Sequence, residues 1–207
     1  MNKITKFLTT ISVSAAFMFS AAIVHAAPEV GVKAPEFTMT DTQGNLVTSA
    51  DLVGKTVVLE WTNHDCPFVR KHYDSGNMQA LQKEATQDDV VWVSVISSAE
   101  GKQGNVSASE ADALTSERNA APSHVLLDAD GVIGKAYEAR TTPHMFVIDP
   151  AGKVAYMGGI DDKPTADKAD IEGAQNYVRS ALAELKDGNA VSTPASRPYG
   201  CSVKYAS

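Results

Sequence analysis

The sequence predicts an α/β protein in which helices flank a mixed β-sheet. Two β-branched apolar runs, at residues 55–62 and 90–96, are typical of strands buried inside a sheet. Segments of helical composition alternate with these runs, which is the pattern of a layered α/β domain. Two further apolar runs, at 144–149 and 153–158, are separated by a Pro-Ala-Gly turn and indicate a hairpin. We therefore expect both parallel and antiparallel strands in one sheet.

The helices are expected from composition and from one capping signal. Residues 67–84 directly follow the first strand and have helical composition, with apolar side chains spread along them. Residues 107–119 should form a helix that opens with a capping box made by Ser107 and Glu110. The remaining elements expected are a short strand at 124–128, a short helix at 131–139 and one long helix at 167–185.

The first 26 residues have the order of a secretory signal peptide. Lys3 and Lys6 form a short positive region, residues 7–24 are almost uncharged and mostly apolar, and Ala26 and Ala27 follow as small residues. An uncleaved membrane anchor is the alternative, but the apolar run is close to the minimum length for spanning and contains Ser and Thr. We expect cleavage and a secreted protein, periplasmic if the source is Gram-negative, with no stable membrane insertion afterwards.

Cleavage would leave one domain and a tail. We expect the signal peptide at 1–26, a single domain at 27–186 and a C-terminal tail at 187–207, which is rich in Ser, Pro and Gly. Cleavage removes two positive charges and no negative one, so the net charge would fall from −7 to −9. Such an acidic surface argues against nucleic acid or anionic lipid as a partner.

The local sequence around Cys66 predicts a reactive thiol. Cys66 follows a buried strand and precedes a helix that would begin at Pro67, a residue suited to the first helical turn. Free N–H groups and the positive end of the helix dipole would favour the thiolate and lower its pKa. Arg70 and Lys71 add positive charge nearby. A buried, inert cysteine is the alternative, but the polar residues at 63–65 argue against burial.

Three segments of the chain resemble the redoxins, the alkyl hydroperoxide reductase and thiol-specific antioxidant family. Residues 31–55, which begin GVKAPEF and end in a Gly-Lys pair, resemble the redoxin entry segment. Residues 61–71 resemble the thioredoxin active-site turn, and residues 142–149 resemble the thioredoxin cis-proline loop with its strand. The resemblance runs from residue 28 to about residue 185. It implies a thioredoxin-like fold.

The resemblance also implies roles for particular residues. Cys66 would be the catalytic nucleophile. Pro143 would follow a cis peptide bond, and Thr142 would offer its backbone to a substrate as an added strand. Glu60 stands where related proteins carry a buried proton acceptor, and it lies either inside, with a raised pKa, or on the solvent-facing side of its strand. Arg140 lies in a region where peroxiredoxins carry an arginine that stabilises the thiolate and the peroxide.

The sequence departs from the patterns of both thioredoxins and peroxiredoxins. Val69 stands where thioredoxins have their second cysteine, so a CxxC redox cycle is impossible. Peroxiredoxins have their reactive cysteine at that second position, whereas Cys66 occupies the first. The chain therefore resembles the peroxiredoxin-like group that keeps only the first cysteine.

The second cysteine, Cys201, lies in the tail, which is flexible enough to return to Cys66. It could supply the resolving thiol through a mixed disulfide, or it could form a permanent bridge that pins the tail. We expect a Cys66–Cys201 disulfide because unpaired thiols are disfavoured outside the cytosol.

Metal binding is a different class of function. Folding could bring His64, Cys66 and His144 together, and a thiolate with imidazoles suits copper or zinc. The ligand spacing is not diagnostic, since the CxxxC pattern of thioredoxin-fold copper chaperones is absent. His72 is expected on the surface of the helix after Cys66. A non-catalytic binding module has no specific support in the sequence.

The function predicted from the sequence is an exported thiol-disulfide oxidoreductase of the redoxin type. Its substrate would be a protein or a small-molecule thiol or disulfide. A thiol peroxidase with antioxidant activity, acting on peroxide, is the alternative. No cofactor is expected for either reaction.

Overall fold

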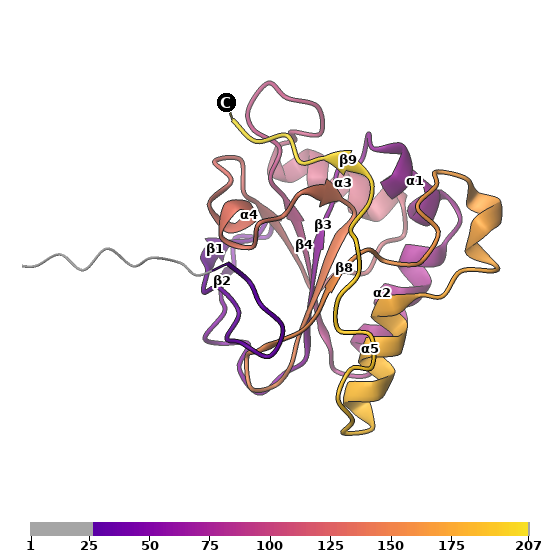
Figure 1. The fold of residues 1–207 in the computed structure, drawn as a ribbon. Coiled ribbons are helices and arrows are strands. Elements are labelled where there is room, and N and C mark those ends of the chain that lie inside the picture. Colours follow the sequence, from indigo (N-terminus) through magenta and orange to yellow (C-terminus); the bar gives the residue numbers. More distant parts are fainter. Residues whose placement is uncertain (1–26, 207) are drawn as a thin grey trace, which may run out of the picture.

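The computed structural model describes residues 27–206, so the signal peptide predicted at 1–26 lies outside the described residues. The central sheet contains β3 (Val57–Trp61), β4 (Val91–Ile96), β5 (His124–Leu127), β7 (His144–Ile148) and β8 (Val154–Gly158). Their order is β5-β4-β3-β7-β8 (Figure 1). The β3–β4 and β4–β5 pairs are parallel, and the β3–β7 and β7–β8 pairs are antiparallel. This confirms the mixed sheet and the hairpin expected from the sequence.

Two short ladders lie outside the central sheet. They pair β1 (Thr38–Thr40) with β2 (Leu46–Thr48), and β6 (Thr141–Thr142) with β9 (Cys201–Ser202). The helices are α1 (Pro67–Asp74), α2 (Asn77–Gln87), α3 (Ala108–Glu117), α4 (Val132–Ala136) and α5 (Tyr177–Lys186), with a 3-10 helix η1 (Lys168–Ile171). In Figure 1, α2 and α5 cover one side of the sheet, while α4, β1 and β2 lie on the other. Among residues 27–206, no helix combines the length and apolarity needed to cross a membrane.

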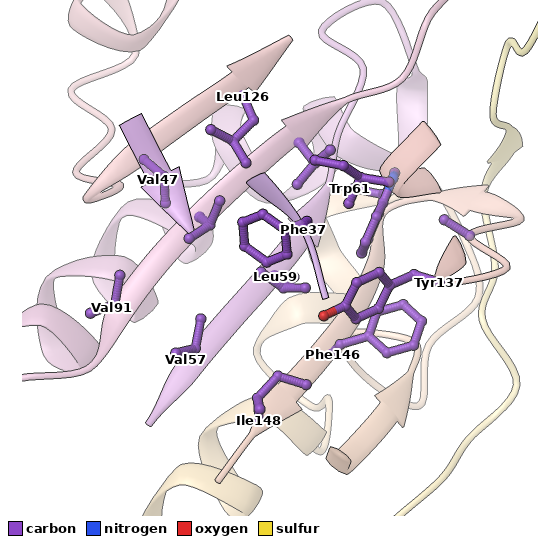
Figure 2. Close-up of a cluster of buried hydrophobic side chains, with 14 of the residues drawn as sticks. Phe37, Val47, Val57, Leu59, Trp61, Val91, Leu126, Tyr137, Phe146 and Ile148 are labelled. Atoms are coloured by element: carbon purple, nitrogen blue, oxygen red, sulfur yellow. The ribbon is translucent and has the colours of Figure 1, made fainter. Parts of the chain in front are cut away.

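Alternation along the central strand β3 separates two hydrophobic clusters. Val57, Leu59 and Trp61 pack into one cluster with Tyr137 and Phe146, and Figure 2 shows these side chains together. The ring centroids of Trp61, Tyr137 and Phe146 all lie 5.3 Å apart. The intervening Val58 belongs to the second cluster, which the sheet forms with α1, α2 and α5. Both faces of β3 are therefore buried, as its continuous apolar sequence predicts.

Two of the expected helices are each divided in the structure. The expected helix at 67–84 is interrupted at Gly76, whose φ of 77° is left-handed and ends one helix before the next begins. The expected helix at 167–185 is also wrong, because only η1 and α5 form within it. Asp167 and Asn176 each accept a hydrogen bond from a backbone N–H, so Asp167 caps the start of η1 and Asn176 caps the start of α5. The capping box of Ser107 and Glu110 is confirmed at the start of α3.

The C-terminal tail is docked along the domain rather than free of it. After α5 it returns beside the outer edge of β8, where Met157 exchanges backbone hydrogen bonds with Pro194 and Ser196 (Figure 1). It then forms β9 against β6. Beyond β9, the backbone N–H of Ala99 donates to the carbonyl of Lys204 at 2.8 Å. The tail thus crosses the end of the sheet at which α1 begins.

Candidate active site

Cys66 is placed by the junction of β3 and α1. It is the N-cap residue of α1, with extended backbone angles (φ −73°, ψ 123°), and Pro67 occupies the first turn as expected. The carbonyl of Cys66 accepts the first helical hydrogen bond, from Arg70 N–H at 2.9 Å. The N–H of Val69 faces the sulfur and stabilises its charged form. This is the helix N-terminus at which a thiolate is favoured.

The loop before β7 faces this cysteine. The Thr142–Pro143 peptide bond is cis, which confirms the conformation expected for Pro143. The Cys66 Sγ lies 3.0 Å from the carbonyl oxygen of Thr142. The backbone of the cis-proline loop is therefore within reach of the sulfur.

The tail brings the second cysteine to the same place. Cys201 Sγ lies 2.7 Å from Cys66 Sγ, although 135 positions separate the two residues. Strand β9 pairs with β6 so that Cys201 stands opposite Thr142 and Ser202 opposite Thr141. Cys66 has no exposed surface, whereas Cys201 is half-buried. The expectation that polar neighbours keep Cys66 from burial is thus wrong, because the sulfur is enclosed between the carbonyl of Thr142 and the Cys201 sulfur of the tail.

The two thiols have opposite tendencies to ionise. Burial opposes ionisation of Cys66, but hydrogen bonds to its sulfur, first from the Cys201 thiol and also from the Val69 N–H, outweigh it and lower the pKa of Cys66. Burial and the adjacent Cys66 sulfur raise the pKa of Cys201 to about 11. The pair therefore favours one negative charge on Cys66, with the remaining proton on Cys201.

The positive side chains next to Cys66 in sequence point elsewhere. Arg70 is exposed and lies near Asp74, with a separation of 3.9 Å. Lys71 is buried and donates to the carbonyl of Lys163 at 2.8 Å. The stabilisation of the Cys66 thiolate thus comes from hydrogen bonds, not from the neighbouring cations that sequence reasoning invoked.

Glu60 is buried, which resolves the two positions left open for it. Its carboxylate accepts hydrogen bonds from Trp92 Nε1 at 2.9 Å, from the Tyr73 hydroxyl at 2.9 Å, and from the side chains of Ser94 and Gln82. Burial raises the pKa of Glu60, and these hydrogen bonds only partly oppose that rise. Within residues 27–206, none of the hydrogen bonds of this carboxylate reaches either cysteine.

Arg140 and the histidines are not gathered around Cys66. The Arg140 guanidinium is largely exposed and pairs with Glu138 at 3.0 Å. His144 packs against Phe146 and its Nδ1 accepts from the Arg140 backbone N–H, while His64 pairs with Asp65. In the described part of the chain, no cluster of three or more His, Cys, Asp or Glu side chains is arranged to hold a metal ion.

Sequence reasoning missed a polar pocket beside the active site. The hydroxyl of Tyr199 donates to Asp161 and lies 3.2 Å from His72 Nε2. His72 is fully buried, contrary to the expectation of a surface position, and burial lowers the pKa of His72 to about 4. Lys71 Nζ lies 3.7 Å from Asp161. The only sequence feature that pointed to this pocket was the tyrosine two positions before Cys201 in the tail.

A sheet of this order, with a cysteine at the start of α1 that faces a cis-proline loop, defines a thioredoxin-like fold. The family model described as Redoxin matches residues 29–174, and the chain belongs to the redoxin family. This agrees with the resemblance found in the sequence.

Solved structures give the same fold. An uncharacterized conserved protein from Geobacillus kaustophilus is 26% identical, with a TM-score of 0.76 over 86% of this chain and 93% of that one. A hypothetical protein from Sinorhizobium meliloti 1021 is 22% identical, with a TM-score of 0.73 over 88% and 97%. A secreted Mycobacterium tuberculosis disulfide oxidoreductase is 24% identical, with a TM-score of 0.51 over 72% and 96%. No match was found among curated proteins.

Proposed function

We propose that this protein is an exported thiol-disulfide oxidoreductase in which Cys66 is the nucleophile and Cys201 the resolving cysteine. The observation that carries the proposal is the 2.7 Å separation of the two sulfurs at the start of α1, beside the carbonyl of Thr142. The lowered pKa of Cys66 supplies a thiolate, and the raised pKa of Cys201 keeps the second proton in place. Export rests on the signal-peptide pattern of residues 1–26.

The reaction needs only these two sulfurs and a substrate disulfide. The Cys66 thiolate attacks one sulfur of that disulfide, a mixed disulfide forms, and the other substrate sulfur leaves as a thiolate. Cys201 then attacks Cys66 Sγ, which forms the Cys66–Cys201 disulfide and releases the second substrate sulfur. The proton lost by Cys201 goes to a released thiolate. The substrate is reduced by two electrons, the cysteine pair is oxidised by two, and the reverse sequence oxidises a substrate dithiol.

The carbonyl of Thr142 and the cis-proline loop would hold the substrate chain. Thr142 already pairs with a strand, namely β9, and that pairing aligns a cysteine with Cys66. A protein substrate that adds a strand at this place would present its own cysteine in the same way.

The test is disulfide exchange by the wild type, Cys66→Ser and Cys201→Ser. Wild-type protein equilibrated in glutathione buffers should show a single two-electron transition, in which both cysteines become resistant to alkylation together in mass spectra. It should also accelerate the reduction of insulin by dithiothreitol, and Cys66→Ser should not. Cys201→Ser should accumulate a mixed disulfide on Cys66. A Cys66–Cys201 bridge that resists reduction in the folded protein would instead identify a structural crosslink and refute the proposal.

A further inference from the structure

The tail occupies the position at which a substrate strand would bind. Strand β9 is antiparallel to β6, with Cys201 opposite Thr142, and the Val203 N–H donates to the carbonyl of Arg140 at 3.1 Å. An extended segment that adds a strand through its backbone and fills side-chain pockets is a common form of peptide recognition. The bound tail therefore reveals which side chains this surface accepts.

The position before the cysteine accepts only glycine. Gly200 has a φ of 130°, and a Cβ added there would lie 2.1 Å from the carbonyl oxygen of Thr142. Atoms at that distance overlap, and the obstacle is backbone in the cis-proline loop rather than the end of a mobile side chain. The close approach of the two strands next to Cys66 thus selects against every residue with a side chain.

The position two residues before the cysteine accepts a phenol. The Tyr199 ring packs edge-on against Phe68, with centroids 6.0 Å apart, and Lys71 Nζ lies 5.8 Å from the Tyr199 centroid. Its hydroxyl donates to Asp161 and lies against His72. Both of these side chains are buried and belong to the body of the domain, so the pocket combines an aromatic wall with a fixed acceptor.

We propose that this surface is a peptide-binding site for an extended Tyr-Gly-Cys segment, and that residues 199–201 are its resident occupant. The partner is a protein that presents the same three residues as a strand, so that its cysteine takes the place of Cys201 beside Cys66. This inference rests on the proposed function and names the substrate class of the same site. Since Cys66 has no exposed surface while the tail is docked, the partner must displace the tail first.

The experiment uses three full-length variants whose only thiol is Cys66. Cys201→Ser keeps a tail that can dock, and Gly200→Val/Cys201→Ser should hold the end of the tail away because the added side chain meets Thr142. Gly173→Ala/Cys201→Ser is the matched control, since a Cβ at Gly173 meets nothing within 4 Å. The probe is a synthetic peptide with the sequence of residues 197–203, activated at its cysteine as a 2-pyridyl disulfide. Attack by Cys66 forms the protein–peptide disulfide and releases thiopyridone, which is followed by its absorbance.

The Gly200→Val/Cys201→Ser protein, called the opened variant, should prefer the unchanged peptide. It should react with that peptide at least about tenfold faster than with a peptide in which valine replaces the glycine, or one in which alanine replaces the tyrosine. Cys201→Ser and the Gly173→Ala control should react equally and more slowly than the opened variant. A peptide with phenylalanine in place of tyrosine should also react more slowly with the same protein, because it lacks the hydroxyl that donates to Asp161.

Equal rates with all of the peptides would overturn the inference. Reaction of the same variants with 4,4′-dithiodipyridine, which needs no peptide site, separates this failure from that of the proposed function. Rapid reaction with this small disulfide and no preference among peptides would reject the peptide site alone. Slow reaction of the opened variant with dithiodipyridine as well would mean that Cys66 is not a reactive thiol, and both proposals would fail.

Discussion

Removal of one hydroxyl group, by Tyr199→Phe, should loosen the tail over Cys66. The Tyr199 hydroxyl donates to the buried carboxylate of Asp161 and lies 3.2 Å from His72 Nε2, and the substitution leaves the packing against Phe68 in place. A hydrogen bond to a charged group contributes about 1.5–3 kcal/mol. The equilibrium for opening of the tail should therefore increase by about ten- to a hundredfold.

The opening can be measured by alkylation of Cys66 in a Cys201→Ser background. Because Cys66 is sealed while the tail is docked, its reaction with iodoacetamide requires opening, and under slow alkylation the rate follows the opening equilibrium. Mass spectrometry of quenched samples gives the modified fraction over time. We expect the rate for Tyr199→Phe/Cys201→Ser to exceed that of Cys201→Ser by at least about tenfold.

A second tyrosine provides the control. Tyr137 also donates its hydroxyl to a single acceptor, the carbonyl of Pro35 at 2.8 Å, but it lies in the cluster on the opposite face of the sheet (Figure 2). Tyr137→Phe should lower the free energy of global unfolding by about 1 kcal/mol and leave the alkylation rate of Cys66 unchanged. Equal alkylation rates with tyrosine and phenylalanine at position 199 would refute the argument that Asp161 anchors the tail.

Three further predictions concern buried titratable groups and the exposed Arg140. Burial lowers the pKa of His144 to about 4, so the neutral side chain stabilises the fold above pH 6.5 and this stabilisation is lost as the pH falls toward 4. In urea unfolding curves, the free energy of unfolding of His144→Asn should fall by about 3 kcal/mol less than that of wild type over this pH range. Burial raises the pKa of Glu60 above 4.5, so the protonated side chain stabilises the fold at low pH and this stabilisation is lost as the pH rises through the raised value. The free energy of unfolding of Glu60→Gln should therefore increase relative to that of wild type between pH 4 and pH 7 in the same curves. Because the Arg140 guanidinium is exposed and pairs with Glu138, we expect wild type to consume hydrogen peroxide no faster than Cys66→Ser; a faster rate would restore the peroxidase alternative.

The elements that could be predicted from the sequence are those specified by short-range patterns. The strand at 57–61, the hairpin after Pro143 and the capping box at Ser107 each depend on residues within a few positions of one another, and the structure contains all three. The break at Gly76 is not predicted, because a single glycine within a helical segment does not by itself end the helix.

The polar pocket and the burial of Cys66 could not be predicted in this way. Cys66 is covered by a residue 135 positions away, and Tyr199 meets its partners at separations of 127 and 38 positions. The polar neighbours of Cys66 suggested exposure, but what covers the sulfur is not encoded locally. The tail lacks hydrophobic periodicity because it is held by its backbone and by individual side chains rather than by an apolar face.

The course of the tail beside β8 bears on the way this protein should be truncated. The unpaired edge of a sheet is a template on which other chains can add strands and aggregate. Pro194 and Ser196 occupy the backbone groups of Met157 on that edge, and Ser196 Oγ accepts from the Gly159 N–H at 3.0 Å. A chain that ends after α5 would lose this cover together with Cys201. Any loss of activity caused by its self-association could then be mistaken for an effect of the missing Cys201 thiol. The single substitution Cys201→Ser removes the sulfur and leaves the sheet edge protected.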